Sequence, residues 1–207
     1  MTTLTTILYL AVPYTAFGAG MMTRGDARAR VVRQAERLPL ATIALCCLVG
    51  IPSLLQLPFP RLLYALRRDG DQILHHGELW RLFTALVVQD GGTAGLVGNL
   101  LILALVGVLA ERIWGSWRAV ALFLGTGILS EFVGLAWQPI GAGNSVANFG
   151  LASSVLLCCL LRASSIPPRV LSAVGIASGL ALLLARDIHG GATAIGLCLS
   201  AGLLALS

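Results

Sequence analysis

The sequence predicts an all-α membrane protein, in which a six-helix bundle follows an additional amino-terminal helix. Of the 207 residues, 57% are apolar and 11% are charged, and the mean hydropathy is +0.88. Soluble domains average about 45–50% apolar and about 25% charged residues, so this much apolar surface needs a bilayer as its solvent. The fourteen basic residues are all arginine and lie mostly in short segments between apolar runs. Such arginines are topology signals, and the net charge of +5 does not indicate nucleic-acid binding.

Seven apolar runs are long enough to cross a bilayer, which takes about 17–25 helical residues. They are residues 4–22, 39–57, 93–111, 117–136, 145–161, 169–185 and 189–206. The first run lacks the basic start and the cleavage site of a secretory signal, so we predict an extra helix there. A re-entrant or interfacial segment broken at Pro13 is the alternative. The chain therefore divides into residues 1–38, a helix with a basic segment, and residues 39–207, the membrane domain.

The arginines also predict an orientation. The connections on one side of the membrane carry nine arginines, and those on the other side carry five. The first set is 23–38, 112–118 and 162–169, and the second is 58–92, 137–144 and 186–188. Because the arginine-rich side is normally cytoplasmic, the helices that begin near residues 93, 145 and 189 should all start on the extracytoplasmic face. The long connection 58–92 mixes aromatic, basic and apolar residues, which predicts an interfacial loop with short helices.

Two polar residues at helix starts on this face could perform hydrolytic chemistry. Ser145 follows Gly143 and Asn144, and a glycine before a helix allows a tight turn that leaves free N–H groups near the hydroxyl. Such donors stabilise an oxyanion, and His189 at the start of the last helix could take the serine proton. Alternatively, Asn144 or Ser145 is only a helix cap, and His189 is only an interfacial residue. The five cysteines show no metal-ligand spacing, so we predict neither a metal site nor a cofactor.

Small residues at helical spacing indicate close helix contacts. Gly107, Glu111 and Gly115 form one stripe, and Ala192 and Gly196 follow His189 on one face. Glu111 lies near the other end of its helix from the Ser145 face. A structural hydrogen-bonding role is therefore expected for this carboxylate.

In their order along the chain, these motifs resemble the rhomboid family of intramembrane serine proteases, over about residues 39–206. The matching motifs are Glu78-Leu-Trp-Arg-Leu-Phe-Thr84, Asn99, the Gly107–Glu111–Gly115 stripe, Gly143-Asn144-Ser145-Val146 with Phe149 one turn on, and His189 with Ala192 and Gly196. The resemblance implies a Ser145 nucleophile and a His189 general base, with Asn99 and the Ser145 N–H at the oxyanion. It also implies that Phe149 packs against the histidine, and that Gly143 and Asn144 shape the site.

The family resemblance implies a multi-pass protein of the cell membrane that cleaves transmembrane protein substrates on its extracytoplasmic side. Three positions depart from the family pattern. Gly95 stands where the family usually has a histidine that donates to the oxyanion, Val146 stands where glycine is common, and an alternative register would place Thr193 at the histidine position. A rhomboid-like protein that binds transmembrane helices without cutting them is the alternative function. A small transporter or channel is a third hypothesis, and the sequence predicts no oligomeric state.

Overall fold

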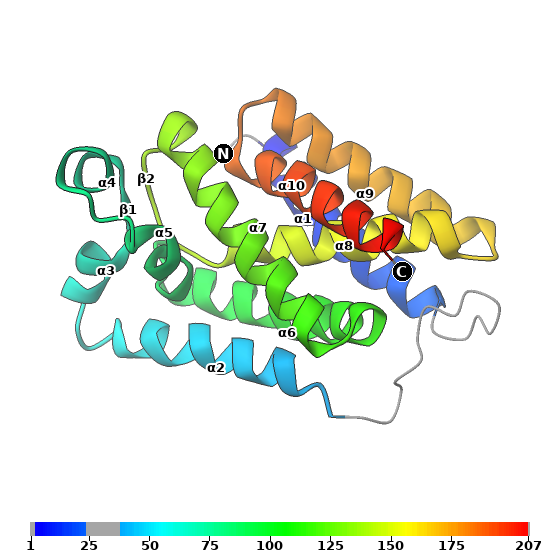
Figure 1. Ribbon diagram of the computed structural model, residues 1–207, viewed down its shortest axis with the longest axis horizontal. Helices are drawn as coiled ribbons and strands as arrows, with labels where there is room; N and C mark the ends of the chain where they lie inside the picture. The colour runs from blue at the N-terminus through cyan, green and yellow to red at the C-terminus, as the bar shows by residue number, and fades with distance from the viewer. Residues whose placement is uncertain (1–2, 24–37, 207) are drawn as a thin grey trace.

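The computed structural model describes residues 3–23 and 38–206 as a bundle of long helices with short elements at one end (Figure 1). Six helices are long and apolar enough to span a membrane. They are α1 (Thr3–Thr23), α6 (Gly92–Trp114), α7 (Ser116–Trp137), α8 (Ser145–Arg162), α9 (Ile166–Leu184) and α10 (Ile188–Ala205). The prediction of an all-α, multi-pass membrane protein is confirmed. Most of the basic segment 23–38 lies outside the described residues.

The second predicted span is shorter in the structure than in the sequence pattern. The apolar run covered residues 39–57, but α2 (Leu40–Leu55) has sixteen residues and ends in a turn before Pro60. Sixteen helical residues measure about 24 Å, which is less than the hydrocarbon core of about 30 Å. α2 packs against α6 and α7.

α8 is the central helix of the bundle. It packs against α1, α6, α7, α9 and α10, and almost all its residues from Val146 to Cys159 are buried. In Figure 1, α7 crosses in front of α8, while α2 and α6 lie on one side and α9 and α10 on the other. Any side chain at the start of α8 is therefore surrounded by other helices.

α1 is one continuous helix through Pro13, so the alternative of a segment broken there is wrong. It packs along α9 and α8 and also contacts α6. Its buried side contains mostly small residues, and Thr23 at its end contacts Cys159 of α8, with 3.6 Å between Oγ1 and Sγ. The amino-terminal helix is thus an integral part of the bundle.

The connection from α2 to α6 folds into short elements. They are α3 (Arg61–Leu66), β1 (Arg68–Asp69), α4 (Gly70–His76), α5 (Arg81–Thr84) and the 3-10 turn η1 (Ala85–Val87). β1 pairs in antiparallel register with β2 (Ile140–Gly141), so that Arg68 lies opposite Gly141. This pairing ties the connection to the segment that leads into α8.

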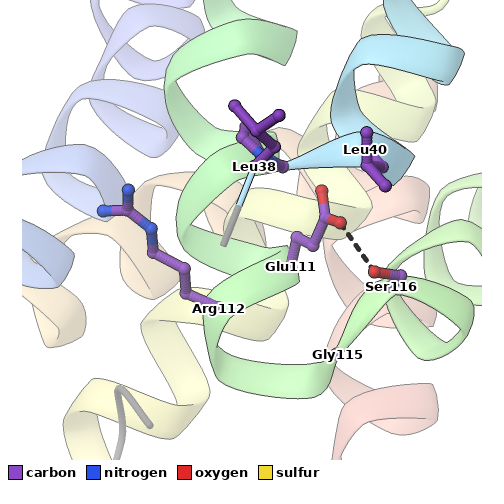
Figure 2. A pocket seen from close by; sticks show the side chains of 7 residues that line it. Leu38, Leu40, Glu111, Arg112, Gly115 and Ser116 are labelled. Carbon is purple, nitrogen blue, oxygen red and sulfur yellow. Dashed lines mark hydrogen bonds between the residues drawn. The ribbon is translucent and has the colours of Figure 1, made fainter. Parts of the chain in front are cut away.

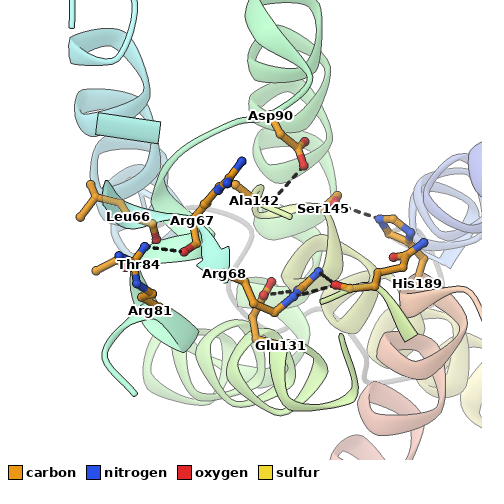
Figure 3. A network of polar contacts seen from close by, with 11 residues as sticks. Leu66, Arg67, Arg68, Arg81, Thr84, Asp90, Glu131, Ala142, Ser145 and His189 are labelled. Atoms are coloured by element: carbon orange, nitrogen blue, oxygen red, sulfur yellow. Dashed lines mark hydrogen bonds and ion pairs between the residues drawn. The ribbon is translucent and has the colours of Figure 1, made fainter. Parts of the chain in front are cut away.

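A buried ion pair strengthens that tie. The Arg68 and Glu131 side chains, which are 4% and 2% exposed, form a salt bridge, and the Arg68 guanidinium also donates to the Gln138 carbonyl at 3.0 and 2.6 Å. Figure 3 shows the Arg68–Glu131 pair beside the segment that leads to Ser145 at the start of α8. In the same view, the Arg81 guanidinium and the Thr84 hydroxyl donate to carbonyls at the end of α3.

Glu111 organises the opposite end of the bundle (Figure 2). Its carboxylate accepts the backbone N–H groups of Ala41 and Thr42 at 3.0 and 2.8 Å, and the hydroxyls of Thr42 and Ser116 at 2.8 and 2.7 Å. A carboxylate at the amino-terminal end of a helix satisfies free N–H donors and complements the helix dipole. Glu111 therefore joins the start of α2 to the α6–α7 turn.

Candidate active site

Ser145 and His189 meet at the start of α8 and α10. The distance from Ser145 Oγ to His189 Nε2 is 2.9 Å, which is a hydrogen bond (Figure 3). The two residues are far apart in the sequence but occupy the first turns of helices that pack along each other. A hydroxyl and an imidazole in this geometry form the nucleophile–base pair that acyl transfer requires.

Asp187 extends this pair on the other side of the imidazole. Its Oδ1 lies 2.7 Å from His189 Nδ1 and also accepts the His189 backbone N–H at 2.9 Å. Because a carboxylate only accepts, Nδ1 carries the proton, and Nε2 is free to accept from the serine hydroxyl. Partial burial alone would raise the pKa of Asp187. The hydrogen bonds and charge of His189 outweigh burial, so the pKa of Asp187 lies below its ordinary value.

Gly196 allows α10 to approach α8 this closely. A Cβ added to Gly196 would lie 2.8 Å from the Cα and carbonyl oxygen of Gly150, which is too close for any side chain. Ala192, one turn nearer the histidine, is fully buried. The small-residue stripe predicted on the last helix thus faces α8.

The turn before Ser145 depends on Gly143, whose φ is +135°. Residues with side chains rarely adopt this conformation. The Gly143 N–H donates to the Ala85 carbonyl at 2.8 Å, and the Ala142 N–H donates to the Asp90 carboxylate at 3.0 Å. The first N–H groups of α8 have no helical acceptors and remain available beside Ser145.

A network of amide side chains lies behind the serine. Asn99 Nδ2 donates to Gln89 Oε1 at 2.8 Å, Gln89 Nε2 donates to Asn144 Oδ1 at 2.9 Å, and Asn144 Nδ2 donates to Asn148 Oδ1 at 3.2 Å. Asn148 closes the network by donating to the Asn99 carbonyl at 2.9 Å. Asn144 occupies the N-cap position of α8, but its side chain makes no cap hydrogen bond and belongs to this network instead. Asn99 keeps a second N–H for another acceptor.

Two aromatic rings pack against the imidazole. The ring centroid of His189 is 4.9 Å from that of Phe149 and 4.7 Å from that of Tyr9 of α1, and Tyr9 and Phe149 are also 4.9 Å apart. These distances are typical of favourable ring pairs.

Two cavities reach Ser145 and His189. One, of about 320 Å³, is bounded by Arg68, Glu131 and the 138–143 segment. The other, of about 440 Å³, lies between α1 and α6 and is lined by Tyr9, Tyr14 and Gly95 among others. No atom lies within 4 Å of where a Cβ of Gly95 would be, so this position faces open space. Within residues 3–23 and 38–206, no group of His, Cys, Asp or Glu side chains could hold a metal ion.

The residues singled out in the sequence are brought together here, with Gly95 on the cavity wall. Thr193 points elsewhere, because its hydroxyl donates to the His189 carbonyl at 3.0 Å and its side chain packs on Gly179 of α9. Asp187 was expected at this membrane face as a polar residue beside His189 but was given no role, and Gln89 and Tyr9 were not predicted. The position of Asp187 two residues before His189 was a possible signal for its role, whereas no motif in the neighbouring sequence distinguishes Tyr9.

Comparisons with known proteins agree with this geometry. A family model described as "Rhomboid domain" matches residues 76–205, which include α6 to α10 but neither α1 nor α2. The chain is 34% identical over 99 residues to the rhomboid protease GluP of Bacillus subtilis (strain 168). The aligned segment covers 47% of this chain and 19% of that relative, so the match spans about a fifth of the relative's length.

Proposed function

The chain belongs to the rhomboid family, and on that premise we propose that it is an intramembrane serine endopeptidase that cleaves transmembrane proteins. The similarity to a rhomboid protease supports this activity. The observation that carries the proposal is the unbroken hydrogen-bond chain from the Ser145 hydroxyl through His189 to Asp187. A protein that only binds helices does not require this chain of hydrogen bonds.

The proposed reaction uses Ser145 as nucleophile and His189 as general base. Ser145 Oγ attacks the scissile carbonyl carbon while His189 Nε2 takes the hydroxyl proton. The imidazolium gives this proton to the leaving amine as the C–N bond breaks, which leaves an ester on Ser145. A water molecule, deprotonated by His189, then attacks the ester, and the proton returns to Ser145 Oγ as the carboxylate product leaves.

The negative oxygen of each tetrahedral intermediate needs donors. The backbone N–H of Ser145 and the free N–H of the Asn99 side chain are the groups that we assign to it. A Cβ placed on Gly143 would lie 3.6 Å from Asn99 Nδ2 and 3.8 Å from Ser145 Oγ, so the Asn99 amide and the nucleophile lie near the same point. Preorganised donors of this kind supply a large part of the rate in acyl transfer.

The cavity between α1 and α6 is the proposed place of the substrate chain. Its α6 wall carries Gly91, Gly95 and Gly98, so a polypeptide backbone can approach closely there. The cavity opens onto Ser145, where the scissile bond must lie. From the arginine distribution, we place this end of the bundle on the extracytoplasmic face of the cell membrane.

The test is labelling of detergent-solubilised protein with a fluorophosphonate, which reacts with activated serines. Wild type should be labelled, and Ser145→Ala and His189→Ala should not be, while both variants keep the wild-type elution volume and thermal transition. Cleavage of a transmembrane reporter should be lost in the same variants. Labelling of Ser145→Ala at the wild-type rate would show that the nucleophile is a different residue.

A helix-binding protein without protease activity is the second candidate. Gly95 favours it, because this position supplies no side-chain donor toward the oxyanion. Well-folded wild type that takes up no fluorophosphonate, but still co-purifies with a transmembrane helix, would support this function over proteolysis.

A further inference from the structure

α1 lies outside the segment that matches the family, yet it is built into the bundle. A Cβ added to Gly20 would lie 2.7 Å from Leu109 of α6, and one added to Gly175 of α9 would overlap the Thr15 hydroxyl. Contacts this close on two neighbours require matched shapes along the helix. The position of α1 beside α6, α8 and α9 is therefore well defined.

This position brings one side chain of α1 to the catalytic pair. The Tyr9 ring meets the His189 ring edge-on, with 4.7 Å between centroids and an interplanar angle of 81°. Phe149 completes a cluster in which each ring contacts the other two. The imidazole is thus held by Asp187 at Nδ1, by Ser145 at Nε2, and by Phe149 and Tyr9 as ring neighbours.

The two aromatic neighbours differ in origin. Phe149 is 1% exposed and belongs to α8, the helix that also carries Ser145. Tyr9 is only partly buried, and beyond it lies the cavity between α1 and α6. Without the Tyr9 ring, the imidazole would face that cavity, and its χ angles would no longer be restricted on that side.

We propose that α1 is a functional part of the active site and that Tyr9 is a positioning residue, which holds the His189 ring toward Ser145. The inference rests on the proposed protease activity. Tyr9 acts through the histidine and not on the substrate bond. Its aromatic ring, and not its hydroxyl, is the required feature.

The experiment measures fluorophosphonate labelling rates over a range of probe concentrations, with wild type, Tyr9→Ala, Tyr9→Leu and Tyr9→Phe. Ile7→Ala is the matched control, since Ile7 is 59% exposed on the same helix but lines neither of the two cavities at Ser145 and takes no part in the ring cluster. Elution volume and thermal transition are recorded for each variant. Tyr9→Leu retains an apolar side chain in case Tyr9→Ala does not fold.

The limiting rate constant should fall about tenfold or more in Tyr9→Ala and Tyr9→Leu, because misplacing a reacting group by about 1 Å costs up to about 10²-fold. The probe concentration at half-saturation should stay unchanged, as should the rates of Tyr9→Phe and Ile7→Ala. If wild type is labelled and folded Tyr9→Ala or Tyr9→Leu reacts at the same rate, this inference is overturned while the proposed protease activity stands. A loss of rate in Tyr9→Phe as large as in Tyr9→Leu would also overturn this inference. No labelling of folded wild type would overturn the proposed protease and this inference together.

Discussion

Asp187 has two contacts that substitutions can separate. Its Oδ1 accepts the His189 backbone N–H at 2.9 Å as a helix cap and the His189 ring Nδ1–H at 2.7 Å. Asparagine keeps an oxygen at this place and is itself a good helix cap. Asp187→Asn therefore removes the negative charge with little change in geometry, whereas Asp187→Ala removes the acceptor as well.

The expected loss follows from the strength of these hydrogen bonds. A hydrogen bond to a charged group is worth about 1.5–3 kcal/mol, and a neutral one about 0.5–1.5 kcal/mol. The two side chains are each 16% exposed, so solvent screens the charge only in part. The missing charge should cost about 1–1.5 kcal/mol when the imidazolium forms, which is about a tenfold lower rate. Asp187→Ala frees the ring to turn, and a loss of about 10²–10³ is expected, within the range of general base catalysis.

The assay is the fluorophosphonate labelling rate, together with cleavage of a transmembrane reporter in the same detergent. Rates should decrease from wild type to Asp187→Asn and further to Asp187→Ala. Thermal unfolding is the control, and both variants should fold, with Asp187→Ala losing about 1 kcal/mol for the missing cap and Asp187→Asn losing less. If folded Asp187→Ala reacted as fast as wild type, Asp187 would be a helix cap and nothing more.

Four further predictions concern the same end of the bundle. The depressed pKa of Asp187 means that its stabilising effect is present above its unfolded-state pKa of about 3.9 and is lost as pH falls through the lower folded-state value. The difference in Tm between wild type and Asp187→Asn should therefore shrink in that acid range, and a pH-independent difference would contradict the coupling. Asn99→Ala should lower turnover by about 10²–10³ while some labelling remains, and an unchanged rate would remove Asn99 from the oxyanion site. Gly95→His should raise turnover, by up to about 10²-fold, because the position has room for a side chain and gains a donor; an unchanged rate would mean that the existing donors suffice. Arg68→Met should lower stability by about 3–5 kcal/mol by leaving the Glu131 carboxylate buried alone, and adding Glu131→Leu should restore most of it. Thermal unfolding in detergent measures this, and equal stability of the single variant and wild type would refute it.

The helices could be predicted because hydropathy is a local property of the chain. Each long apolar run became a helix, and the exception in length, α2, ends early where a turn precedes Pro60. The pairing of β1 with β2 was not predicted, since two-residue strands carry no alternating pattern. Such pairings arise only when the helices have placed distant segments together.

The candidate site also has one part that the sequence could predict and another part that it could not. Topology alone placed Ser145 and His189 at one membrane face, and the structure brings their side chains within hydrogen-bonding distance. Gln89 lies in the turn before α6 and Tyr9 lies on α1, so both depend on how distant segments pack together, and neither residue stands in a distinctive pattern. The neighbours of α1 in particular follow from shape matching between small residues, which hydropathy does not encode.

The contact between Gly150 and Gly196 has a consequence for which sequences this fold can tolerate. Alanine is as compatible with lipid as glycine and forms better helices, so by composition alone Gly196→Ala is a harmless change. Yet the two glycines lie about 8–11 Å along their helix axes from Ser145 and His189, since each helical residue rises about 1.5 Å. A methyl group on Gly196 would press on the Gly150 backbone, push α10 away from α8 and so move the base away from the nucleophile without touching either. The tolerance at Gly196 is therefore set by the distance between two helices and not by polarity, and this distance also sets the separation of nucleophile and base.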